Sequence, residues 1–251
     1  VIIMRRYKMV IISIIILLLI NNIMHSKVSY ALDIANSKNQ VLLSEIPNEE
    51  IYLYALDYDE GKSVYEDILL NVKGKKKRFN WIVDSGLSFR PELILTDINN
   101  DGKKELVIII TTGHGTGINT QEVHIFKEET LEEIKVQNPF DIISKNVKTK
   151  VYKDENSVKV YININGKESV ISSKKLNELY NDQNNKKNFG DTLFFRDFLI
   201  YEVYNEKLKA IVGGDIFFWN YLVNIKIEYK FESNMLVVDK IYFDVTEYFK
   251  D

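Results

Sequence analysis

One short acidic stretch, Asp97–Leu106, constrains the fold more than any other part of the sequence. It reads Asp-Ile-Asn-Asn-Asp-Gly-Lys-Lys-Glu-Leu, with oxygen-bearing side chains at alternate positions and a glycine where the chain must turn sharply. Short apolar runs flank it, Pro91–Thr96 on one side and Leu106–Ile110 on the other, and both are typical of buried β-strands. The stretch therefore predicts two neighbouring strands joined by an acidic turn.

The turn offers the ligands that a hard cation such as Ca²⁺ prefers, which are several oxygens at roughly 2.3–2.6 Å from a tightly wound loop. The candidate ligands are the side chains of Asp97, Asn99, Asp101 and Glu105 and the backbone carbonyl of Lys103. An EF-hand is excluded, because it needs a closing glutamate about twelve residues along, where this chain has an isoleucine. We expect a structural calcium site. The alternative is a turn without metal, since Asp, Asn and Gly favour turns.

Strand, acidic turn and strand in this order resemble the calcium loop of the FG-GAP/VCBS repeat, the blade unit of integrin-type β-propellers. That family has the pattern Asp-x-[Asp/Asn]-x-Asp-Gly-x-x-[Asp/Glu] followed by an apolar strand, and residues Asp97 to Glu105 match it. The resemblance covers about one blade, residues 91–126, and implies calcium binding and a binding or adhesion role. A closed propeller needs at least about four blades, so one such loop does not predict a whole propeller.

The N-terminal segment is organised like a secretory signal peptide. A basic start, Arg5–Lys8, precedes the apolar run Met9–Ile20, and Ser29–Ala31 fits the small-x-small rule for cleavage. We expect residues 1–31 to be a signal peptide and the protein to be secreted or held in the cell envelope. The alternative is a retained membrane anchor, although the run is shorter than the ~20 apolar residues of a spanning helix.

Composition narrows the classes of function. The chain has no cysteine, which excludes disulfides, thiol catalysis and cysteine lipidation. Removing residues 1–31 takes away four cationic residues and no acidic one, so the formal net charge falls from −3 to −7. We expect no nucleic-acid partner, because that affinity rests on Lys and Arg neutralising phosphates. The one basic cluster, Lys73–Arg78, is interpreted as a solvated hairpin tip.

The remaining pattern predicts a mainly β fold of antiparallel strands and hairpins, with the blade-like unit and one or two short helices. Residues 32–50 are interpreted as a polar linker and residues 51–251 as a single β-rich domain. Strands are expected over 51–55, 68–72, 79–83, 158–164, 169–171, 194–204, 209–212, 222–231 and 235–245, and helices over 139–145 and 172–180.

Two short motifs suggest chemistry. Residues 113–117, Gly-His-Gly-Thr-Gly, resemble the histidine motif of subtilisin-type proteases, but the chain lacks the Gly-Thr-Ser setting of their nucleophile. We interpret Gly113, His114, Gly115 and Gly117 as a flexible loop beside the metal and a candidate ligand loop, and we assign no catalytic residue.

Asp84-Ser85-Gly86 resembles the signature of aspartic proteases, whose mechanism needs two carboxylates sharing one proton. The chain has a single motif of this kind. An aspartic-protease-like hydrolase is therefore the alternative to a non-catalytic module. Aromatic residues gather between Phe189 and Tyr221, where strand aromatics are more often core than contact surface. The leading interpretation is a calcium-binding module outside the cell, with a protein or a carbohydrate as its partner.

Overall fold

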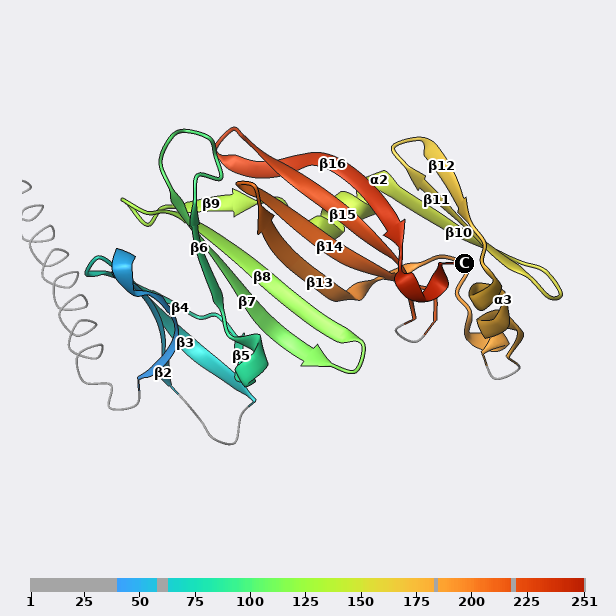
Figure 1. The fold of residues 1–251 in the computed structure, drawn as a ribbon, viewed down its shortest axis with the longest axis horizontal. Coiled ribbons are helices and arrows are strands. Elements are labelled where there is room, and N and C mark those ends of the chain that lie inside the picture. The colour runs from blue at the N-terminus through green and yellow to red at the C-terminus, as the bar shows by residue number, and fades with distance from the viewer. Residues whose placement is uncertain (1–39, 58–62, 183–184, 218–219, 251) are drawn as a thin grey trace, which may run out of the picture.

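The computed structural model describes residues 40–57, 63–182, 185–217 and 220–250. Within these ranges the chain forms three sheets of predominantly antiparallel strands and two short α-helices (Figure 1). The expected mainly β class is therefore confirmed. The expected signal peptide, residues 1–31, lies outside the described residues. No helix in the described part of the chain is long and apolar enough to cross a membrane.

The N-terminal sheet has the strand order β1–β2–β3–β4, with β5 also paired to β3. Its strands are β1 (Val41–Ile46), β2 (Ile51–Asp57), β3 (Val64–Val72), β4 (Lys75–Phe79) and β5 (Val83–Asp84). Strand β1 lies inside the stretch interpreted as a linker. It pairs with β2 along its length and buries Leu43, so the folded domain begins before residue 51.

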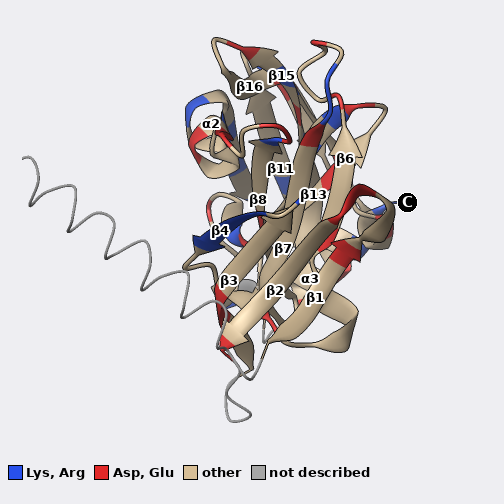
Figure 2. Cartoon of the chain, turned by 90° about the vertical axis from the view of Figure 1, so that its left-hand side faces the viewer, with Lys and Arg blue, Asp and Glu red and all other residues tan. Residues whose placement is uncertain are grey.

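The basic stretch Lys73–Arg78 is not a hairpin tip as expected. Only Lys73 and Gly74 form the turn, with φ angles of 49° and 80° that suit a tight two-residue hairpin. The remaining four residues belong to strand β4, where Figure 2 shows a run of basic residues. The strand expected over 79–83 is therefore wrong: β4 runs from Lys75 to Phe79, residues 80–82 are not strand, and Val83 begins the separate strand β5.

The largest sheet has eight strands in the order β13–β14–β15–β16–β9–β8–β7–β6. Its strands are β6 (Glu92–Thr96), β7 (Glu105–Gly115), β8 (Ile118–Lys127), β9 (Glu133–Val136), β13 (Phe194–Tyr204), β14 (Lys207–Asp215), β15 (Tyr221–Glu232) and β16 (Met235–Val245). Strand β7 covers one edge of β8, and the other edge is shared by β9 and, through Asn119 and Thr120, by β13. Six strands, from β8 through β9, β16, β15 and β14 to β13, thus close into a ring.

Strand β7 lies between two hydrophobic cores and contributes side chains to both. Leu106, Ile108 and Ile110 pack against the N-terminal sheet, whereas Val107 and Ile109 belong to the core of the ring. All five side chains are almost fully buried. A strand that is buried on both faces needs apolar residues at successive positions, and this explains the unbroken apolar run after the acidic turn.

A third sheet lies at the other end of the molecule from β1–β5 (Figure 1). It contains β10 (Val147–Lys153), β11 (Val158–Ile164) and β12 (Lys167–Ile171). The two expected helices are present as α2 (Pro139–Asn146) and α3 (Lys174–Asn181). Asn138 and Ser173 cap them by accepting hydrogen bonds from backbone N–H groups of the first turn. Four single-turn 3₁₀ segments complete the described structure, at Pro47–Glu49, Leu87–Phe89, Lys186–Asn188 and Glu247–Phe249.

Candidate metal centre

The acidic turn between β6 and β7 is wound tightly by its own side chains. The Asp97 carboxylate accepts the backbone N–H groups of Asp101, at 3.1 Å, and of Gly102, at 2.9 Å. The Asp101 carboxylate accepts the N–H of Lys103 at 2.9 Å. Gly102 has a φ of 85°, which only glycine adopts without strain. The sequence pattern of alternating oxygens and one glycine therefore folds into a compact loop, as expected.

Three of the predicted ligands converge at the first residue of β7. Glu105 is 2% exposed, and its carboxylate accepts the N–H of Ile98 at 3.2 Å and the side-chain amide of Asn99 at 2.9 Å. The same amide donates to Asp101 at 3.1 Å. Both donors to Glu105 are neutral. Burial, together with the negative charge of Asp101 and then of Asp97, raises the pKa of the Glu105 carboxyl.

Lys103 does not neutralise this cluster with its side chain. Its ammonium group pairs with Glu129 at 3.2 Å, on the loop between β8 and β9, and both side chains are mostly exposed. Its part in the predicted site is its backbone carbonyl. The side-chain charge of Lys103 is thus directed to Glu129 and not to the buried carboxylate of Glu105.

The donor set of the turn fits a hard cation, since carboxylate, carboxamide and carbonyl oxygens are the ligands of Ca²⁺. Among the described residues, no group of three or more histidine or acidic side chains is already arranged around a metal position. The Asn99 amide instead lies between Asp101 and Glu105, where it places the partial positive charge of its hydrogens. The side-chain oxygens of Asp101 and Glu105 thus both lie within hydrogen-bond distance of one amide group.

The other end of β7 also holds a buried carboxylate. Asp84 is 6% exposed, accepts the N–H of Gly86 at 2.8 Å, and pairs with Nδ1 of His114. The imidazole stacks on Phe89, with 4.1 Å between ring centroids. A Cβ at position 86 would lie 3.0 Å from the Asp84 carboxylate and 2.9 Å from the Phe89 ring. The glycine of the Asp-Ser-Gly motif therefore makes room for this arrangement.

Two motifs that the sequence presents separately thus meet in space. The contact between Asp84 and His114 depends on the pairing of β5 with β3 and on the packing of β5 beside β7, and no local pattern announces it. The arrangement differs from the alternative proposed for Asp84, because the partner of that carboxylate is an imidazole and not a second carboxylate. The His114 side chain itself is 41% exposed.

The candidate ligand loop is placed differently from the expectation. Gly113, His114 and Gly115 are the last residues of β7, and Gly117 lies in the turn to β8. Eight residues of extended strand, roughly 26 Å, separate Gly113 from Glu105. The hydroxyl of Tyr221 donates to the carbonyl of Gly117 and ties the turn to the ring. The glycine-rich stretch therefore does not lie beside the predicted metal site.

Comparisons with family models, with curated proteins and with solved structures give no match to this chain. The described residues contain one antiparallel meander, β6–β7–β8–β9, that carries the acidic turn. In the same sheet β9 also pairs with β16, and β8 also pairs with β13, and these two pairings close the ring. The resemblance to the FG-GAP/VCBS repeat remains a prediction from the motif.

Proposed function

We propose that this protein is a calcium-binding, non-catalytic binding or adhesion module that acts outside the cell. One observation carries the calcium assignment: the buried Glu105 carboxylate lies beside Asp101 and has only neutral hydrogen-bond donors. Burying a carboxylate is unfavourable unless positive charge offsets it. Lys127 lies opposite Glu105 on β8 and interacts with it electrostatically, but its ammonium group is hydrogen-bonded to Glu132 at 2.8 Å. A bound Ca²⁺ would add positive charge at the Glu105 carboxylate itself.

The cation would act as a structural clamp. Asp97, Asn99 and Asp101 belong to the turn, whereas Glu105 is the first residue of β7, the strand on which both cores pack. An ion held by both parts links the turn to the centre of the fold. Because it binds the folded chain and not the unfolded one, it stabilises the protein by linkage.

The binding or adhesion role rests on the family resemblance and on the predicted signal peptide. Extracellular calcium modules bind their ion with dissociation constants of about 10⁻⁴–10⁻³ M. The turn also contacts the loop between β8 and β9 through the Lys103–Glu129 ion pair. An ordered turn would therefore present a fixed surface to a partner when calcium is bound.

Calorimetric titration of the full chain with CaCl₂ tests the proposal. We expect one site, lost in Asp101→Ala and kept in Asp239→Ala, which removes an exposed acid from strand β16. Equal binding by both variants would contradict the assignment to the turn. A titration to about 10 mM calcium reaches a concentration well above the dissociation constants expected for such sites. If it releases no heat, and if calcium at this concentration does not reduce the luminescence of Tb³⁺ bound to the protein, calcium binding itself is contradicted.

The hydrolase alternative at Asp84 makes a separate prediction. Proteolysis at acid pH that disappears in Asp84→Asn would contradict the non-catalytic assignment. The imidazole partner of Asp84 does not supply the second carboxylate that this chemistry requires, so we retain the binding module as the proposed function.

A further inference from the structure

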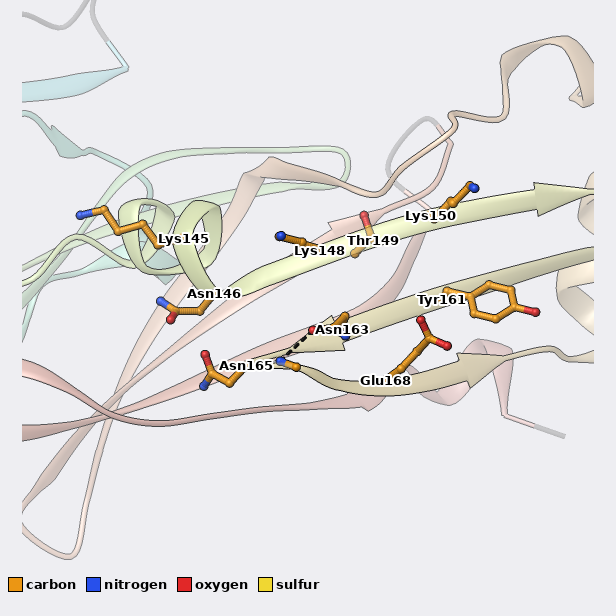
Figure 3. Close-up of a pocket in the computed structure, with 10 residues that line it drawn as sticks. Lys145, Asn146, Lys148, Thr149, Lys150, Tyr161, Asn163, Asn165 and Glu168 are labelled. Carbon is orange, nitrogen blue, oxygen red and sulfur yellow. Dashed lines mark hydrogen bonds between the residues drawn. The ribbon is translucent and has the colours of Figure 1, made fainter.

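A second basic surface forms where α2 leads into β10, from lysines that lie within six residues of one another in the sequence. Lys145 lies in the last turn of α2, and Lys148 and Lys150 follow on β10. These three lysines line one groove of about 660 Å³, together with Tyr161 and Asn163 of the neighbouring strand β11 (Figure 3). Lys148 and Lys150 are two residues apart on a strand, so they share a face and are about 7 Å apart. We call this surface the lysine groove.

The lysine groove is not neutralised by the protein. All three side chains are exposed, and in the described part of the chain none of them takes part in an ion pair. Lys153, at the end of the same strand, does pair, with Asp191 at 2.7 Å. One carboxylate, that of Glu168, lines the groove against three ammonium groups. The groove therefore has a local excess of positive charge on a protein whose net charge is negative.

The basic stretch on β4 is different and serves as an internal comparison. Lys73 pairs with Glu128, and Lys77 donates to the carbonyl of Leu131 at 3.0 Å. Both partners lie in the loop between β8 and β9, so this loop offsets part of the charge of the basic stretch. Arg78 pairs with Asp67 within the sheet. The stretch that is most basic in sequence is thus largely satisfied by the fold, whereas the lysine groove is not.

The other groups of the groove suit a sugar chain. Tyr161 packs edge-on against Tyr152, with 4.8 Å between ring centroids, and Lys150 lies over the Tyr152 ring. These contacts hold aromatic surface beside the charges, and aromatic rings pack against the C–H faces of sugars. The Asn163 oxygen accepts the N–H of Gly166 at 2.9 Å, which leaves its amide hydrogens to donate to a hydroxyl or a carboxylate.

We propose that the lysine groove binds an acidic polysaccharide, through its carboxylate or sulfate groups at the lysines and its sugar rings at Tyr152 and Tyr161. The inference deepens the proposed binding role by naming the partner class. It does not depend on calcium, because the groove lies on α2 and β10–β11 and shares no residue with the acidic turn. Exposed charges act over about a Debye length, so binding weakens as salt is added.

The test measures binding of the full chain to fluorescently labelled polygalacturonate, to heparin and to neutral dextran by anisotropy. The double variant Lys148→Glu/Lys150→Glu should weaken binding to at least one acidic polymer by about tenfold or more, since two attractive charges become repulsive. The matched control, Lys76→Glu/Lys207→Glu, makes the same change in net charge at exposed lysines outside the groove and should bind as the unmodified protein does.

The two acidic polymers distinguish carboxylate from sulfate as the recognised group, and binding to either supports the proposal. Equal weakening in the control variant, equal binding to dextran, tighter binding to duplex DNA than to either polymer, or no binding at low salt would overturn it. Loss of polymer binding on chelation of calcium would overturn the assignment to the groove. Calcium binding that persists while polymer binding is absent would leave the calcium proposal intact.

Discussion

Strand β7 begins at one buried carboxylate, Glu105, and ends beside another, Asp84, and the two have different partners. Asp84 meets the imidazole of His114, a side chain that can carry positive charge. Glu105 meets an amide and a backbone N–H, which cannot. A buried acid is stable when it is paired or protonated. Asp84 is thus part of an internal pair, whereas Glu105, whose hydrogen-bond donors are neutral, is the acid at which we propose that calcium binds.

Of the substitutions that test this difference between the two acids, Glu105→Gln is expected to have the largest effect. At a calcium concentration of one hundred times the dissociation constant, the ion should stabilise the unmodified protein by about 2.7 kcal/mol, and this increment should vanish in the variant. In chelator the variant should be at least as stable as the parent, because a buried charge has been removed. Urea unfolding with and without calcium measures both quantities, and Glu206→Gln, which changes an exposed acid in the turn between β13 and β14, is the control. A calcium increment that survives in Glu105→Gln would contradict the assignment.

At the other end of β7, His114→Ala should lower the free energy of unfolding by about 2 kcal/mol, because it leaves the Asp84 carboxylate buried without its imidazole partner. The double variant Asp84→Asn/His114→Ala should recover part of the loss, since no charge is then buried. Chemical denaturation at neutral pH measures the cycle. Additive losses in the double variant would show that the two side chains do not act as a pair.

The pH dependence also separates two kinds of acid, because the pKa of an acid bonded to an imidazole and the pKa of the buried Glu105 shift in opposite directions. Contact with His124 holds the pKa of Glu122 below its usual range, whereas the pKa of Glu105 is raised by burial and by Asp101. A raised pKa means that the folded chain binds the proton more readily than the unfolded chain, so this group adds stability as the pH falls.

In chelator, the stability of the parent relative to Glu105→Gln should therefore increase from neutral pH down through the folded pKa of Glu105 and level off below the unfolded value near 4.3. Calcium should reverse the trend, because it binds the ionised carboxylate. Melting curves of the two proteins between pH 4 and 7 in steps of about half a unit provide the check. A difference that is flat with pH would mean that Glu105 titrates normally.

The smallest effect is expected at the surface of the turn. Lys103→Gln removes an exposed ion pair with Glu129 and should change the free energy of unfolding by less than about 0.5 kcal/mol. Calcium affinity should remain within a few-fold of the parent, because the predicted ligand is the backbone carbonyl of this residue. Loss of calcium binding in Lys103→Gln would contradict this expectation, because it would mean that the Lys103 side chain is needed for the shape of the turn.

Local signals in the sequence predicted the elements around the candidate site. The acidic turn, the apolar run that became β7 and the capped helices α2 and α3 all depend on residues close together in the chain. Local signals failed where a segment is ordered by pairing or packing with another segment that is not part of the local pattern. Strand β1 looks like a polar linker because little more than Leu43 is buried, and its pairing with β2 is what orders it.

The functional pairings could not be predicted for the same reason. Asp84 and His114 are thirty residues apart and meet only because β5 packs beside β7. The ring closes through two parallel contacts, β13 with β8 and β16 with β9, which no hairpin pattern announces. The basic stretch on β4 was misplaced because its lysines contact the loop between β8 and β9, which is more than fifty residues away in the sequence.

The most direct test of the central claim, that Glu105 and its neighbours form a calcium site, is a thermal melt of the full chain in excess calcium and then in chelator, with Asp101→Ala measured alongside. We expect a higher melting temperature with calcium for the parent and the same temperature in both conditions for the variant. Superimposable melts of the parent in calcium and in chelator at neutral pH would contradict it.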